Sequence, residues 1–101
     1  MKEVCNKKNY ILALGAESEG IFAVCKNGNI FISRNFGDLF VEDNFLKYKK
    51  AVVGCLKRCG RKPEAIITDL HPLFKTTILG EELAKKYIPS VIKNLKFEKK
   101  Y

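Results

Sequence analysis

Short apolar runs alternate with polar breaks along the first third of the chain. Residues 10–16 (Y-I-L-A-L-G-A) are continuously apolar, which is typical of a central strand buried on both faces. Two further runs, 21–25 and 30–33, flank an Asn27-Gly28 pair, which accommodates the positive φ angles of a tight hairpin turn. The pattern therefore predicts three antiparallel strands at the start of the domain.

A pattern of apolar residues typical of a helix follows these strands. The helix is expected to begin at Asp43 or Asn44, either of which can cap it, and to end before Gly60, which tolerates a left-handed cap. Lys57 and Arg58 in its last turn suit the negative end of the helix dipole. Its apolar positions recur at spacings of three and four residues and are Phe45, Tyr48, Val52, Cys55, Leu56 and Cys59.

The last third of the chain predicts a strand at 64–68, a second helix that Thr76 or Thr77 caps and that runs to about Tyr87, and a final strand over 88–97. The predicted order is βββαβαβ. Three hairpin-linked strands followed by right-handed crossovers build a mixed sheet with helices packed on it. The predicted fold class is therefore α/β, in a ribonuclease H-like arrangement.

Composition limits the number of domains. A chain of 101 residues with 47% apolar and 30% charged residues can bury a real core, but it is too short for two lobes. Residues 1–101 are therefore expected to form a single ribonuclease H-like domain, with a frayed basic terminus at 98–101. The net charge of +8 is spread along the chain without a nucleic-acid signature, so nucleic acid is not the expected partner.

The four cysteines, Cys5, Cys25, Cys55 and Cys59, are interpreted as buried thiols, because a chain with this many core residues needs no disulfides. Cys55 and Cys59 share one face of the predicted helix, but two thiolates alone make a poor zinc site, so no metal is expected. The N-terminal apolar run is too short for a secretion signal or a membrane span. The expectation is a cytoplasmic protein without a membrane partner.

The only histidine follows the fourth predicted strand, in the sequence T-D-L-H-P. Asp69 and His71 stand where this strand meets a loop, at the carboxyl end where α/β sheets place ligands. His71 is a candidate general acid or base, or a group that orients a phosphate. In the alternative interpretation Asp69 caps the turn and His71 packs beneath the following helix, so that both residues are structural.

Several short motifs occur along the chain in a fixed order. They are I-L-A-L-G-A-E at 11–17, F-G-D-L at 36–39, T-D-L-H-P at 68–72 and E-E-L-A in the following helix. Their order and spacing resemble the carbamoyltransferase domain of the HypF hydrogenase-maturation family, over about residues 10–92. The resemblance implies the first ribonuclease H-like lobe of an actin-like, sugar-kinase-like fold, in which nucleotide binds between two lobes.

The resemblance also implies a reaction and a site. The family transfers a carbamoyl group from carbamoyl phosphate, through a carbamoyl adenylate made with ATP, to a cysteine on a partner protein. Asp69 and His71 become catalytic candidates on this basis. The turn after the first strand would offer backbone N–H groups to phosphate, which maps to Gly15, Ala16, Glu17 and Ser18. An ordinary turn between antiparallel strands is the alternative.

Two departures from the family pattern weaken this site. Ser18, Glu19 and Gly20 stand where the family continues with a lysine and an asparagine, so a cation is lost and a carboxylate gained. The sequence V-I-K-N-L-K at 91–96 replaces the histidine cluster that binds the family's catalytic metal.

The expected function is therefore a stand-alone lobe without catalysis or cofactor of its own, related to hydrogenase maturation. Its expected partner is another protein or a second copy, bound through an exposed sheet edge or the lobe interface. One alternative is a subunit of a split carbamoyltransferase that completes an ATP and carbamoyl phosphate site in trans. A weaker alternative is a small basic nucleic-acid-binding protein.

Overall fold

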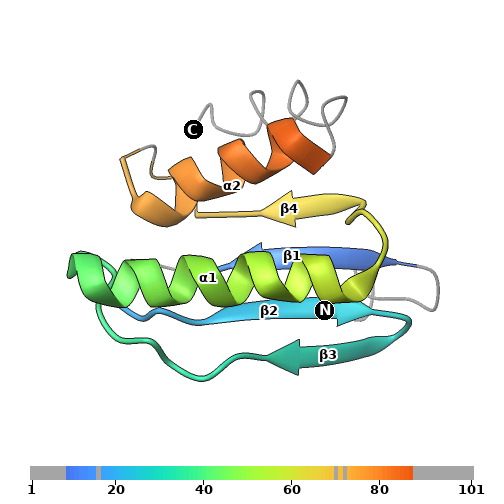
Figure 1. Cartoon of the computed structure of the whole chain (residues 1–101), viewed down its shortest axis with the longest axis horizontal. Coiled ribbons are helices and arrows are strands. Elements are labelled where there is room, and N and C mark those ends of the chain that lie inside the picture. The colour runs from blue at the N-terminus through green and yellow to red at the C-terminus, as the bar shows by residue number, and fades with distance from the viewer. Residues whose placement is uncertain (1–8, 16, 70, 72, 88–101) are drawn as a thin grey trace.

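The computed structural model describes residues 9–87, except residues 16, 70 and 72. These residues form a mixed sheet with two helices packed on it (Figure 1). The elements, in chain order, are β1 (Tyr10–Leu14), β2 (Phe22–Lys26), β3 (Asn29–Ile32), α1 (Glu42–Cys59), β4 (Ala65–Ile67) and α2 (Lys75–Tyr87).

The four strands lie in the order β3-β2-β1-β4. β2 is antiparallel to both β1 and β3, and β4 is parallel to β1, with Leu12 opposite Ile66. The predicted mixed α/β architecture and the order βββαβα are confirmed. The final strand predicted at 88–97 and the basic terminus at 98–101 lie outside the described residues.

The turn between β2 and β3 has the predicted conformation. Asn27 has φ 53° and Gly28 has φ 83°, and the flanking residues Lys26 and Asn29 pair across the hairpin. Two consecutive positive φ angles belong to a type I′ turn, whose twist matches that of the strands. The Asn-Gly pair therefore fixes the register of this hairpin.

One face of the sheet carries the core. Alternate residues of β1 (Tyr10, Leu12 and Leu14) point to this face, because side chains along a strand alternate between faces. They pack with Phe22 and Val24 of β2 and Ile66 of β4 in a single cluster that also contains α1 and α2 residues. The helical members are Tyr48, Val52, Leu56, Leu79, Leu83 and Ala84. In Figure 1, α1 lies lengthwise over β1 and β2, while α2 runs beside β4.

Helix α1 begins one residue earlier than the first predicted cap. Val41 occupies the N-cap position without a side-chain hydrogen bond, so the prediction that Asp43 or Asn44 caps the helix is wrong. Glu42 and Asp43 instead lie in the first turn, where carboxylates interact favourably with the helix dipole. The C-terminal prediction is confirmed, since Gly60 adopts the left-handed conformation with φ 75°.

Helix α2 also begins before its predicted caps. It starts at Lys75, and Thr76 and Thr77 lie fully buried within its first turn. The prediction that one of these threonines caps the helix is therefore wrong. The Thr77 hydroxyl donates instead to the Asp69 carbonyl oxygen at 2.9 Å, which ties α2 to the end of β4.

The cysteines divide into two kinds. Cys55 and Cys59 are free thiols on α1, as predicted, but they are only half-buried, whereas Cys25 on β2 is disulfide-bonded. The interpretation of Cys25 as a thiol is therefore wrong. Cys25 is nearly fully buried, and the apolar composition of its strand gave no sign of a bridge. Neither α1 nor α2 is long and apolar enough to cross a membrane.

A candidate functional site at the carboxyl ends of β1 and β4

Parallel pairing brings the candidate residues to one edge of the sheet. β1 ends at Leu14 and the adjacent β4 ends at Ile67. The segments that follow these strands therefore emerge side by side, at the edge where α/β sheets place their ligands. One segment holds Gly15, Glu17 and Ser18, and the other holds Asp69 and His71, while Ala16 lies outside the described residues.

Position 15 requires a glycine because the backbone at Ile21 passes very close to it. Its N–H donates to the Ile21 carbonyl oxygen at 3.0 Å, and a Cβ atom added to Gly15 would lie only 2.7 Å from the same oxygen. A side chain at this position would force the backbone apart. Because its N–H is already engaged within the protein, Gly15 serves the turn rather than presenting a free donor to an anion.

Glu17 links the two segments directly. Its Oε1 atom accepts a hydrogen bond from the Lys75 N–H at 2.6 Å, across 58 positions of sequence. Lys75 is the first residue of α2, whose first turn contains no acidic residue. The half-buried carboxylate therefore satisfies an orphan N–H group and lies at the positive end of the helix dipole. Sequence reasoning treated Glu17 as a backbone phosphate ligand and missed this role of its side chain.

The Glu17 backbone makes a further hydrogen bond, to the segment before α1. Its carbonyl oxygen accepts a hydrogen bond from the Leu39 N–H at 2.8 Å. Leu39 is fully buried in the core and belongs to the F-G-D-L motif. Two of the motifs singled out in the sequence, those at 11–17 and 36–39, thus meet at Glu17, together with the first residue of α2.

Asp69 and His71 form a compact local turn. The Asp69 carboxylate accepts a hydrogen bond from the His71 N–H at 3.1 Å, and His71 Nδ1 accepts one from the Leu73 N–H at 3.3 Å. The first bond is the arrangement by which aspartate side chains mimic a backbone turn. Because Nδ1 is the acceptor, the neutral imidazole carries its proton on Nε2.

The His71 ring lies at the surface. It stacks on Phe74 with 4.3 Å between ring centroids and an angle of 9° between the planes. The alternative in which Asp69 caps the turn agrees with this geometry, but His71 does not pack beneath the following helix, because it is exposed. Its exposure leaves the imidazole accessible to a ligand or to another protein.

The positive charge of Lys75 faces α1 and not the Gly15 turn. The Lys75 ammonium donates to the Phe40 carbonyl oxygen at 3.3 Å and lies 5.4 Å from the centre of the Phe45 ring. These contacts hold it on the α1 side of the site. On the β1–β2 side, a hollow of about 220 Å³ is lined by Gly15 and Glu19, so a carboxylate lines that cavity. Such surroundings disfavour a bound phosphate.

The described residues contain no group of three or more histidine, cysteine, aspartate or glutamate side chains that could hold a metal ion. The segment at 91–96, where the sequence departs from the family's histidine cluster, lies outside the described part of the chain.

Comparison with known proteins places the chain among its relatives. Residues 6–93 match the family model of the HypF Kae1-like domain. The probable carbamoyltransferase HypF of Methanocaldococcus jannaschii is 32% identical over 83 residues, which cover 81% of this chain. The match spans 11% of that relative's own length. No solved structure matches the chain.

Proposed function

Because the chain belongs to the family of HypF Kae1-like domains, we propose that it forms one lobe of a HypF-like carbamoyltransferase site and does not catalyse the transfer by itself. The proposed process is the one implied by the family, a step of hydrogenase maturation. The proposed fold is a ribonuclease H-like lobe of the actin-like superfamily. The strand order β3-β2-β1-β4 and the placement of both helices support this assignment.

One observation supports the proposal that the lobe does not catalyse the transfer by itself. The backbone donors best placed to bind phosphate at this edge are already paired inside the protein: the Gly15 N–H with Ile21 and the Lys75 N–H with Glu17. Phosphate would have to displace a charge-assisted hydrogen bond and overcome repulsion from two carboxylates, those of Glu17 and Glu19. The lobe alone therefore offers a poor site for ATP or carbamoyl phosphate.

The experiment is carbamoyl phosphate-dependent exchange between ATP and pyrophosphate, which reports formation of the carbamoyl adenylate. The purified chain is expected to give no exchange above background. Calorimetric titration with ATP is expected to give no heat of binding at up to millimolar nucleotide. Exchange by the chain alone, lost on His71→Ala but retained in Leu73→Ala, would refute the proposal. Leu73 is the matched control because it lies in the same turn and is 78% exposed.

The second candidate function is a split carbamoyltransferase completed in trans. The observation that favours it is the exposure of His71 at the same edge as the Gly15 turn, which leaves the imidazole free to face a second lobe. Asp69 and His71 are then its proposed catalytic groups, and ATP and carbamoyl phosphate bind only in the completed site. In a mixture with the remaining HypF domains, exchange should appear and should fall on His71→Ala but not on Leu73→Ala. A mixture that stays inactive counts against this candidate.

The edge strand β3 is the proposed contact for a second copy. All four of its residues are exposed, and Ile30, Phe31 and Ile32 form an apolar run along it. Among the strands of residues 9–87 β3 is an outer strand, and an outer strand with such side chains favours antiparallel pairing with another edge. Sedimentation velocity should show a concentration-dependent dimer that Ile32→Lys weakens and Ile78→Lys does not. Ile78 is the control because it is similarly apolar, is 47% exposed and lies on α2. A monomer at all concentrations would refute this contact.

A further inference from the structure

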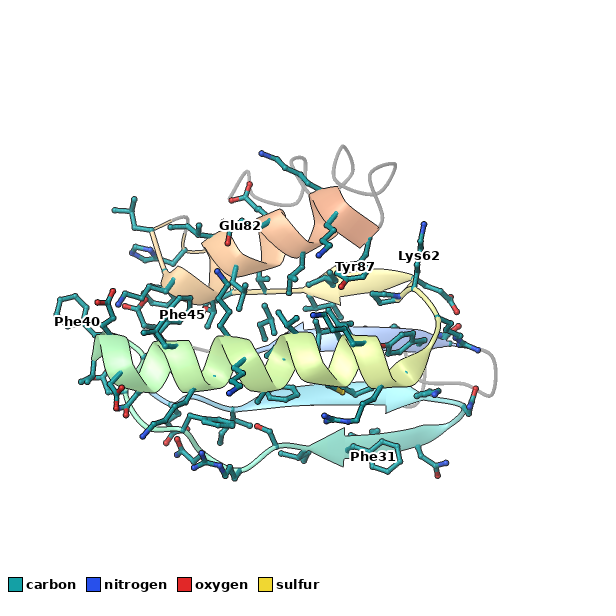
Figure 2. The ribbon with its side chains drawn as sticks, in the orientation of Figure 1. Phe31, Phe40, Phe45, Lys62, Glu82 and Tyr87 are labelled. Carbon is teal, nitrogen blue, oxygen red and sulfur yellow. The ribbon has the colours of Figure 1, made fainter. Side chains whose placement is uncertain are left out.

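A second cavity lies between α1 and the β2–β3 hairpin. Its volume is about 290 Å³, and its apolar walls are Phe22, Val24, Phe31 and Ile32. β3 lies at the edge of the sheet, beyond the part that α1 covers in Figure 1. Phe31 and Ile32 are consequently 60% and 71% exposed, and Phe31 is visible on β3 in Figure 2. The cavity is therefore open to a ligand from solvent.

Two free thiols and two cations line the same cavity. Cys55 and Cys59 lie one helical turn apart on α1, Arg58 lies beside Cys59 in the chain, and Lys26 comes from the end of β2. Two positive charges above apolar walls suit a small molecule that carries both carbon chains and carboxylates.

Cys59 lies within a cluster of hydrogen-bond donors. The Tyr10 side chain is fully buried, and among the described residues its hydroxyl has no hydrogen-bond partner within bonding distance. The Cys59 thiol is the group beside this hydroxyl. Burial alone would raise the pKa of Cys59, but the neighbouring Lys26 and Tyr10 side chains, with the charges of Lys26 and Arg61, lower the pKa below its ordinary value.

Cys55 shares the cavity but not these partners. Its pKa is raised, chiefly because burial disfavours the thiolate, and the nearby Cys59 adds to this effect, although the charge of Arg58 opposes it. At neutral pH the thiolate fraction of Cys59 therefore exceeds that of Cys55. Since the thiolate is the nucleophile, the two thiols of one helix differ in reactivity.

We propose that Cys59 is a modification site that forms mixed disulfides with small disulfides bearing carboxylate groups. The Cys59 sulfur attacks one sulfur of the small disulfide, a new S–S bond forms and the original S–S bond breaks. The other half leaves as a thiolate and takes up a proton from solvent according to its own pKa. The small disulfide is itself the oxidant, so the step needs no other reactant.

The parts of the cavity have separate roles in this step. The Lys26 ammonium and the Arg58 guanidinium pair with the carboxylates of the incoming molecule, and the Phe31 and Ile32 side chains contact its carbon chain. Tyr10 is the first residue of β1, and Lys26 is its partner on β2. Asp69 and His71 follow the carboxyl end of β4, which is parallel to β1, so they lie at the opposite edge of the sheet. The modification site is therefore separate from the proposed carbamoyltransferase site, and it shares only Phe31 and Ile32 with the proposed contact for a second copy.

The test compares the two thiols within the same native protein. The chain is incubated at neutral pH with oxidised glutathione, which is anionic, or with bis(2-hydroxyethyl) disulfide, which is neutral, and adducts are located by peptide mass mapping. Cys59 should react about tenfold faster than Cys55 with oxidised glutathione, because of its larger thiolate fraction and the nearby cations. Its advantage over Cys55 should be smaller with the neutral disulfide.

The Lys26→Gln variant separates charge pairing from general reactivity. It should lower the Cys59 rate with oxidised glutathione several-fold more than the rate with the neutral disulfide. The matched control Lys50→Gln changes an exposed lysine of α1 that does not line the cavity, and it should leave the ratio of the two rates unchanged. Equal rates at Cys55 and Cys59 in the native protein, or an unchanged ratio in Lys26→Gln, would overturn the proposal.

Discussion

Glu17 offers the sharpest test of how the candidate site is held together. Glu17→Ala removes the carboxylate that accepts the Lys75 N–H at 2.6 Å, and it leaves the first N–H group of α2 without a protein partner. Loss of a helix cap costs about 1 kcal/mol, and loss of a carboxylate at the positive end of the helix dipole costs about 0.5 kcal/mol more. The expected loss of unfolding free energy is therefore about 1.5 kcal/mol.

Glu17→Gln divides this loss into its two parts. The glutamine side-chain oxygen can still accept the Lys75 N–H, so this variant should lose only the charge contribution of about 0.5 kcal/mol. Glu19→Ala is the matched control, since Glu19 lies in the same turn and is exposed, and it should change stability by less than about 0.5 kcal/mol.

Urea unfolding followed by circular dichroism measures these differences. At a slope of about 1.5 kcal/mol per molar urea, Glu17→Ala should lower the midpoint by about 1 M and Glu17→Gln by about 0.3 M. Hydrogen exchange of the Lys75 amide should also speed up in Glu17→Ala. Equal midpoints for Glu17→Ala and Glu19→Ala would show that this carboxylate does not join the two segments, and the reasoning would be refuted.

Three further predictions concern the core. Gly80→Ala should destabilise the protein by about 1–3 kcal/mol, because its Cβ would overlap the methyl group of Thr68, the residue that follows β4, and a stability loss below about 0.5 kcal/mol would contradict this packing. Gly54→Ala, the matched substitution in α1, should instead stabilise by about 0.5–1 kcal/mol in the same urea assay, because its Cβ would meet only the end of a flexible arginine side chain. Burial raises the pKa of the Tyr48 hydroxyl in the folded state, so the unfolded chain ionises first and stability should fall as pH rises above about 10. Urea midpoints at about pH 9 and pH 11 measure this decline, which should be smaller in Tyr48→Phe, and an equal decline in both proteins would contradict it.

Local patterns sufficed to predict most of the fold. The apolar run of β1, the Asn-Gly pair between β2 and β3 and the three- and four-residue spacing along α1 each depend on neighbours in the sequence. These signals predicted the number, type and order of the described elements. The Gly60 cap at the end of α1 was also predictable from neighbouring residues, because the left-handed conformation that ends a helix favours glycine at that position.

The helix starts could not be predicted in this way. The hydrogen bond to the first N–H group of α2 comes from Glu17, which is 58 positions distant, so a search for nearby serine, threonine, aspartate or asparagine selected Thr76 and Thr77 instead. Both threonines are buried against the sheet, where Thr77 bonds to the end of β4. One sequence signal did point to a distant cap. The first turn of α2 contains no carboxylate, so a carboxylate from another segment is needed to interact with the positive end of the helix dipole.

The candidate site was predicted in position but not in detail. A strand followed by T-D-L-H-P placed Asp69 and His71 at the carboxyl edge, and the Asp69 turn follows from ordinary turn chemistry. The sequence left open whether His71 faces a ligand or packs beneath α2, and the packed alternative was wrong, because the ring stacks on Phe74 three residues later instead of entering the core. The engagement of the Gly15 N–H depends on where β2 begins, which no local motif specifies.

The most direct test of the central claim is carbamoyl phosphate-dependent exchange between ATP and pyrophosphate, measured on the purified chain alone and again with the remaining HypF domains added. If the chain is one lobe whose phosphate-facing donors are already paired, the chain alone should give no exchange above background. Exchange by the chain alone that His71→Ala abolishes and Leu73→Ala preserves would contradict the claim.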